Sequence, residues 1–224
     1  MSLKVNDEHI FLLDACFVKY KRMKKVIFFM IVSLVSVKSF AQQTSSLTPK
    51  ERDAIIYMRE EEKLARDVYD SMYMKWGVNP FGNIRQSEQI HMDRMKALIE
   101  RYKLPDPVSK NNDMRGLFSN ALLKNYYHEL VSTGSQSLTE ALSTGAKIEE
   151  LDIADLQERI KQTDKPAILA TYNYLTMASE NHLRAFTRRL KMMGINYEPV
   201  FLSKTAFAKI ISAGNTRGGY RRRN

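Results

Sequence analysis

Four amphipathic segments, at residues 48–76, 84–102, 137–162 and 164–193, each carry an apolar stripe that polar residues interrupt near its middle. Steps of three and four residues along each segment trace the face that a helix turns toward a core. An unpaired carboxylate on that face would lose its solvation at a cost of several kcal/mol. Something must therefore compensate for polar groups at a similar depth in all four segments.

The interrupting residues are carboxylates and imidazoles, with one serine. They are Glu62 in the first segment, Glu88 and His91 in the second, Glu149 and Asp152 in the third, and Ser179 and His182 in the fourth. A pair of metal ions would compensate for them, because carboxylate and imidazole ligands from facing helices replace the lost solvation. Glu88 and His91 are three residues apart, so both reach one cluster from the same helix face. The pattern predicts a polynuclear metal site.

Each residue taken singly also has an ordinary structural explanation. A Glu-x-x-His pair is common on solvated helix faces, and a histidine in an apolar stripe, such as His182, is more often a hydrogen-bonded core residue. Glu62 stands in "REEEK" and Glu149 in "IEEL", so neighbouring glutamates leave open a solvated, salt-bridging face. The tyrosines and methionines of the stripes read as core residues. Polar residues interrupt all four stripes at a similar depth, and this coincidence favours a metal site over a separate structural explanation for each residue.

The whole pattern predicts an all-α fold. Thr48 and Glu51 read as a capping box with Pro49 at the first helical position, Ser137 and Glu140 read as a second box, and Asp164 with Pro166 starts a further helix. Four helices of about 20–30 residues fit a four-helix bundle, and the roughly 35 residues between the second and third allow a long crossover. We expect an extra helix at 115–134 within that crossover, and a short C-terminal helix after Ser203.

Residues 23–41 read as a secretory signal peptide. Two lysines follow Met23, an apolar run extends from Val26 to Val37, and small residues precede a cleavage site after Ala41. Translation is then expected to start at Met23, with residues 1–22 as an N-terminal extension. Because the apolar run is short for a membrane span, an exported periplasmic or secreted protein is expected rather than an uncleaved anchor.

The single cysteine and the charge distribution narrow the functional classes. Cys16 precedes the predicted cleavage, which excludes cysteine-attached haem, iron–sulfur clusters and thiol chemistry for the mature form. The formal charge is +10, but four arginines lie in the final eight residues, so the basic balance says little about the domain. We expect a polar linker at 42–47 and a solvated, disordered basic tail at 213–224, with no nucleic-acid partner.

Four ordered motifs resemble a known family. They are "MREEEKLARDVYDSMYMKWG", "FGNIRQSEQIHMDRMKALIERYKLPDP", "GAKIEELDIADL" and "SENHLRAFTRRLKMMGINYEPVFLS". Over residues 48–212 the chain resembles the ferritin-like family catalogued as domain of unknown function 2202. The resemblance implies a ferritin-like four-helix bundle, but the family has no established activity.

The wider ferritin and rubrerythrin superfamily implies a ligand pattern of Glu, Glu-x-x-His, Glu and Glu-x-x-His on successive helices. Matched to this chain, the implied metal ligands are Glu62, Glu88, His91, Glu149 and His182, with Asp152 standing in for an additional rubrerythrin-type carboxylate. Ser179 occupies the position where the fourth helix should carry its Glu. This departure leaves three outcomes open: an asymmetric two-metal site completed by Asp152 or water, a one-metal site, or an empty one.

The resemblance implies iron as the first metal to expect, with manganese or zinc as alternatives. The expected chemistry is that of a non-haem di-iron or di-metal site acting on oxygen, peroxide or ferrous iron, in the manner of a ferroxidase or peroxidase. The alternative is a catalytically inactive bundle that serves as a binding or structural module. The sequence leaves open whether the chain is an enzyme and whether it forms a homodimer.

Overall fold

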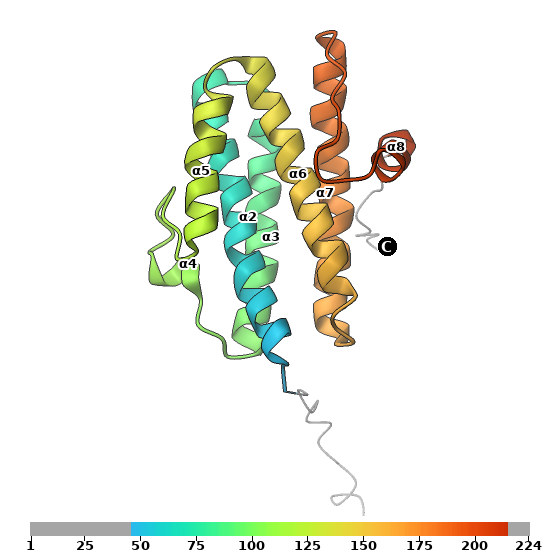
Figure 1. The fold of residues 1–224 in the computed structure, drawn as a ribbon. Helices are drawn as coiled ribbons and strands as arrows, with labels where there is room; N and C mark the ends of the chain where they lie inside the picture. Colours follow the sequence, from blue (N-terminus) through green and yellow to red (C-terminus); the bar gives the residue numbers. More distant parts are fainter. Residues whose placement is uncertain (1–45, 215–224) are drawn as a thin grey trace, which may run out of the picture. The chain divides into compact units, whose positions relative to one another are not determined.

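The computed structural model describes residues 46–214 (Figure 1). The predicted signal peptide, most of the 42–47 linker and the last ten residues of the tail lie outside the described residues. Within residues 46–214, no helix combines the length and the apolar character needed to cross a membrane.

All regular structure in the described chain is helical, which confirms the predicted all-α class. The helices are α2 (Pro49–Trp76), α3 (Phe81–Arg101), α4 (Pro107–Lys110), α5 (Ala121–Gly134), α6 (Leu138–Ile160), α7 (Pro166–Met192) and α8 (Lys204–Ser212).

The first helix begins and ends as its sequence predicts. Thr48 Oγ1 accepts a bond of 3.2 Å from the Glu51 backbone N–H, and Glu51 Oε2 accepts one of 2.8 Å from the Thr48 N–H, which confirms the capping box. At the other end Gly77 has a φ of 63°, a left-handed conformation that glycine adopts without steric cost. α2 is therefore fixed locally at both ends.

Only half of the predicted capping box at the start of α6 forms. Ser137 Oγ accepts from the Glu140 N–H at 3.1 Å, but the described structure lacks the reciprocal bond. The helix predicted from residue 84 begins earlier, at Phe81.

Two more predicted helix starts need correction. Lys165, not Asp164, is the N-cap of α7, because the residue before a proline favours extended backbone and Lys165 has φ −76° and ψ 118°. The crossover helix starts at Ala121, well after position 115, because the side chain of Asn120 caps it by accepting from two backbone N–H groups. The single turn α4, capped by Asp106, was not predicted.

The long helices pack as two hairpins, α2 with α3 and α6 with α7 (Figure 1). The crossover between them contains α4 and α5, and α5 packs against both α2 and α6. α8 packs against α7. The predicted stripes face inward in all four long helices, so the periodicity identified the buried face of each helix correctly.

Two apolar clusters occupy the interior at different levels along the helices. One contains Tyr69, Phe81 and Phe186, and the other contains Met58, Leu98 and Leu175, each with its neighbours. In all four long helices the polar residues of the stripe stand between the members of the two clusters. A buried polar layer therefore separates two apolar cores.

Gly145 allows the helices to approach closely beside this layer. A Cβ atom at this position would lie 2.4 Å from the ring of Phe186, much closer than van der Waals contact. The absence of a side chain thus lets Phe186 of α7 pack directly on the backbone of α6.

Candidate metal centre

The polar residues of the four predicted stripes meet in one buried layer. α2 supplies Glu62, α3 supplies Glu88 and His91, α6 supplies Glu149 and Asp152, and α7 supplies Ser179 and His182. Their exposed fractions run from 0% for His91 and Ser179 to 8% for His182. Ionisable side chains are seldom buried to this extent unless they are paired or hold a metal.

Glu62, Glu88 and His91 form a first group, in which one ligand-type atom from each residue lies within 4.8 Å of the others. His91 Nδ1 is 3.2 Å from Glu62 Oε2 and 2.9 Å from Glu88 Oε2. Because Glu88 and His91 are three residues apart on α3, both side chains are directed to the same side, where α2 presents Glu62.

Glu88, Glu149 and His182 form a second group with the same 4.8 Å limit. His182 Nδ1 is 2.9 Å from Glu88 Oε1 and 3.5 Å from Glu149 Oε2. Glu88 therefore presents one oxygen to each imidazole, and the two rings stack with their centroids 5.4 Å apart. A carboxylate that belongs to both groups is placed to bridge two cations.

Five ligand-type atoms of the layer lack a hydrogen-bond partner among the described residues. They are Glu62 Oε1, Glu88 Oε1, His91 Nε2, Asp152 Oδ1 and His182 Nδ1. Two of these atoms, Glu88 Oε1 and His182 Nδ1, lie 2.9 Å from each other and form an ion pair when the imidazole is protonated. Buried polar atoms without a partner are uncommon, and a bound ion or water usually accounts for them. Carboxylate oxygens with imidazole nitrogens form a donor set that suits iron, manganese or zinc.

Asp152 and Ser179 lie beside the two groups and belong to neither. The Ser179 hydroxyl hydrogen-bonds to Asp152 Oδ2 and is 3.0 Å from the Leu175 carbonyl. Serine at this position leaves α7 with one ligand-type side chain, His182, in the layer. The carboxylate of Asp152 therefore occupies the side of the layer that Ser179 leaves without one.

The carboxylates and imidazoles strongly perturb one another. Burial disfavours the charged imidazolium, but the carboxylates of Glu149 and Glu88 outweigh burial and raise the pKa of His182 to about 9. Burial raises the pKa of Glu62 to about 7, although His91 acts against it. Burial and the nearby Glu62 and Glu61 carboxylates raise the pKa of Asp152 well above its ordinary value. Without a cation the layer must hold protons to limit its negative charge.

Residues 51–214 match the family described as "Uncharacterized protein domain (DUF2202)". The chain belongs to this family. It is also similar to the uncharacterized protein MJ0754 of Methanocaldococcus jannaschii, with 48% identity over 172 residues that cover 77% of this chain and 92% of the relative. A crystal structure titled as hypothetical protein MJ0754 from Methanococcus jannaschii superposes with a TM-score of 0.75 at 46% identity, covering 77% of this chain and 98% of that one.

The DUF2202 description assigns no activity, so the buried layer is the feature of this chain that indicates a function. The structure places the six predicted ligands of this DUF2202 chain together, five of them in the two groups and Asp152 beside them. That these side chains bind metal remains a prediction.

Tyr69 is a further residue of the layer, which the stripe analysis read mainly as core. Its hydroxyl donates to Glu149 Oε1 at 2.6 Å and lies 3.2 Å from the Gly145 carbonyl, while its ring packs 5.3 Å from that of Phe186. Tyr69 is thus both a core residue and a hydrogen-bond donor to a candidate ligand. The sequence signal for this role was the position of Tyr69 seven residues after Glu62, two turns along the same face of α2.

The glutamates beside the candidate ligands are also buried, contrary to the alternative of a solvated face. Glu60 and Glu61 are 2% and 3% exposed, and Glu150 is 0% exposed. Glu60 accepts from backbone N–H groups at the start of α5, and Glu150 accepts from three successive N–H groups at residues 200–202. Sequence periodicity could not show these roles, because the partners are distant loop backbones.

Proposed function

We propose that this chain is a ferritin-like four-helix bundle that holds two metal ions, iron first, and acts on oxygen, peroxide or ferrous iron. The observation that carries the proposal is Glu88, whose two oxygens each approach a different imidazole and which belongs to both groups of possible ligands.

The packing supports the ferritin-like part of the proposal. Two antiparallel helix pairs, α2 with α3 and α6 with α7, are joined by one long crossover that contains α5. One long connection between two helical hairpins is the arrangement of ferritin-like bundles, and such bundles carry their metal ligands on the inward faces of all four helices.

In this proposal Glu62 and His91 would hold one ion and Glu149 and His182 the other, and Glu88 would be available to both. Bound iron would supply the electrons of the reaction and open coordination positions for an oxidant. Asp152, which lies in the layer beside the two groups, would be an additional carboxylate in place of the missing glutamate of α7.

Other side chains keep these ligands oriented. Tyr69 donates to Glu149 Oε1, and Ser87 Oγ lies 3.0 Å from His182 Nε2, which leaves Nδ1 directed at the carboxylates. Partners of this kind fix the orientation of a ligand and tune its basicity. The two apolar clusters on either side of the layer limit access of water to it.

One observation favours a second candidate, an inactive bundle that serves as a binding or structural module. Ser179 stands where a symmetric di-metal site would carry a carboxylate on α7. The carboxylate that could replace it, Asp152, is hydrogen-bonded to Ser179 and lies outside both groups of possible ligands. A site with one metal or none would fit this alternative.

Anaerobic loading with ferrous iron, followed by oxygen or peroxide, separates the two candidates. We expect about two iron ions per chain by elemental analysis, and an absorbance change on exposure to the oxidant. The variants Glu88→Ala and His91→Ala should lose both signals, because each removes a ligand.

The matched controls change residues of the same two types, glutamate and histidine, at exposed positions outside the layer. Glu100→Ala changes an exposed glutamate of α3, and His128→Ala changes an exposed histidine of α5. Both should load and react like the wild type. Iron uptake without any reaction would support the inactive module, and uptake that Glu88→Ala leaves unchanged would refute the site.

A further inference from the structure

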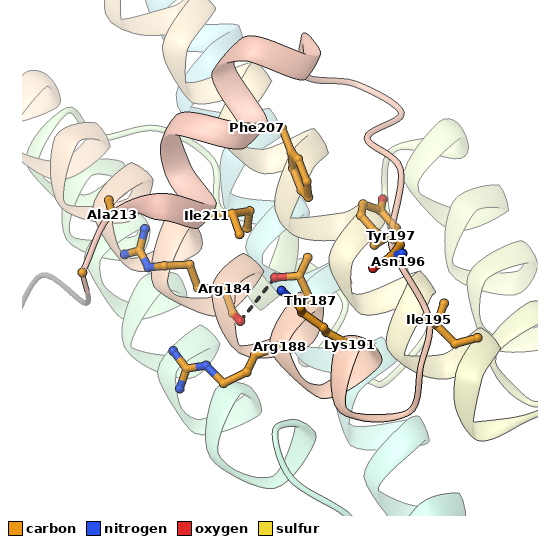
Figure 2. A pocket seen from close by; sticks show the side chains of 11 residues that line it. Arg184, Thr187, Arg188, Lys191, Ile195, Asn196, Tyr197, Phe207, Ile211 and Ala213 are labelled. Atoms are coloured by element: carbon orange, nitrogen blue, oxygen red, sulfur yellow. Dashed lines mark hydrogen bonds between the residues drawn. The ribbon is translucent and has the colours of Figure 1, made fainter.

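A cavity of about 400 Å³ lies between α7, α8 and the segment that connects them (Figure 2). Its volume falls within the roughly 300–1,000 Å³ that is typical of small-molecule sites. The cavity is separate from the polar layer, because Arg184 stands two residues after His182 and projects from a different side of α7. Arg184 Nη1 donates to the carbonyl of Ile210 at 3.0 Å and so holds the last turn of α8 in place.

One wall of the cavity is strongly basic. Arg184, Arg188 and Lys191 follow each other at four and three residues along α7, which places them on the same helix face. None of the eleven lining residues is Asp or Glu. Arg188 and Lys191 are exposed, and neither makes an ion pair with a carboxylate in the part of the chain that the structure describes.

The opposite wall is apolar and aromatic. Phe207 and Ile211, one turn apart on α8, point toward the cavity, and Tyr197 and Ile195 of the connecting segment line its other side (Figure 2). The rings of Tyr197 and Phe207 lie 5.9 Å apart and tilted by 45°. These apolar side chains offer contact area to the body of a ligand, while the basic wall offers charge.

We propose that this cavity binds a small amphipathic anion, with a carboxylate or sulfonate-like head group at Arg188 and Lys191 and an apolar body against Phe207 and Ile211. The head group would supply the negative charge that the lining lacks, through charge-assisted hydrogen bonds to the guanidinium and ammonium groups. The apolar body distinguishes this ligand from a bare inorganic ion.

Anilinonaphthalene sulfonate is a suitable probe, because it joins one anionic group to an aromatic body and fluoresces when it leaves water. We expect saturable binding to the full chain and displacement by decanoate, but not by equal concentrations of decanol or inorganic phosphate. The double variant Arg188→Glu, Lys191→Glu should weaken binding by at least about tenfold. Phe207→Ala should also weaken it, with the charge unchanged.

The matched control is Lys204→Glu with Lys209→Glu, which makes the same change in charge on α8 at two exposed residues outside the lining. Its affinity should stay within about twofold of the wild type. Equal affinities of the two double variants would overturn the proposal. Displacement by phosphate as effective as by decanoate would overturn the amphipathic part. Unchanged far-UV circular dichroism in each variant excludes unfolding as the cause.

Discussion

Two faces of α2 bury charged residues in different ways. On the face that contacts the crossover segment, here called the crossover face, Lys63 and Asp67 form an ion pair and hydrogen-bond to crossover backbone groups. On another face, Glu62 belongs to the buried layer, in which several atoms have no hydrogen-bond partner among the described residues. Lys63 and Asp67 are 0% and 1% exposed. Lys63 Nζ also donates to the Met114 carbonyl at 2.9 Å, and Asp67 Oδ2 accepts from the Gly116 N–H at 2.9 Å. Glu62 Oε1 has no partner in the described chain.

The difference shows that burial of charge does not by itself indicate a ligand site. Both faces of α2 bury ionisable groups equally deeply, but on the crossover face hydrogen bonds satisfy the charges. In the layer, carboxylates face imidazoles at contact distance and several atoms have no partner among the described residues. Buried charges that are satisfied within the protein need no ligand, whereas charges that are not satisfied require a ligand or a proton.

The largest change in the free energy of unfolding is expected for a substitution on the crossover face. Lys63→Met removes one of the two cations that pair with the buried Asp67 and leaves only Arg66. It should lower the free energy of unfolding by about 3 kcal/mol, the low end of the range for a broken buried ion pair. Urea denaturation measures the change. The folded variant should still bind metal, because Lys63 is not among the candidate ligands.

Lys96→Met is the control, since Lys96 is about half exposed and its nearest carboxylate contact is 3.9 Å. It should change the stability by no more than about 0.5 kcal/mol. A similarly small effect at Lys63 would contradict the assignment of the crossover face as the structural one.

The next largest change in stability is expected when a metal ion binds to the layer. At a free metal concentration of about 100 times Kd, binding should stabilise the wild type by about 2.7 kcal/mol. Chelator should reverse the gain, and Glu88→Ala should show none. Thermal unfolding with and without metal measures both; equal midpoints for the wild type would argue against a filled site.

A smaller effect is expected in how the stability of the metal-free protein depends on pH. The pKa of His182 is raised to about 9, so its contribution to stability is fully present below pH 6.5, declines above that, and is gone above about pH 9. Glu62, with its pKa raised to about 7, acts in the same direction between pH 4.5 and 7. The melting temperature in chelator should therefore fall as the pH rises from 5 to 9.

His182→Gln should flatten the upper part of that profile, between pH 6.5 and 9. His128→Gln, a change to an exposed histidine, should leave the profile as it is. Added metal should also flatten it, because metal binding needs deprotonated ligands and strengthens as the pH rises. A metal-free stability that increases from pH 7 to 9 would contradict the arrangement of charges described for the layer.

The sequence predicted what helical periodicity can encode. The inward stripes correctly placed Glu62, Glu88, His91, Glu149 and His182 at one depth, because residues on one helix face keep their spacing in the folded chain. The capping box at Thr48 and Glu51 was equally predictable, since its contacts are local. The metal itself, the family's ferritin-like relationship and the N-terminal processing remain predictions.

The sequence could not show what depends on contacts between distant segments. α4 is too short to produce a period, and the burial of Lys63 and Asp67 depends on a loop some fifty residues away. The approach of Ser179 to Asp152 joins α7 to α6 and has no local signal. The cavity between α7 and α8 likewise arises only when the two helices pack.

Anomalous diffraction from crystals of the full chain, soaked anaerobically with ferrous iron, would show whether the buried layer binds two metal ions. We expect two peaks in the layer, one beside Glu62 and His91 and the other beside Glu149 and His182, with Glu88 contacting both. Iron that binds only elsewhere, or a layer that stays free of iron in crystals saturated with it, would show that the layer is not a metal site.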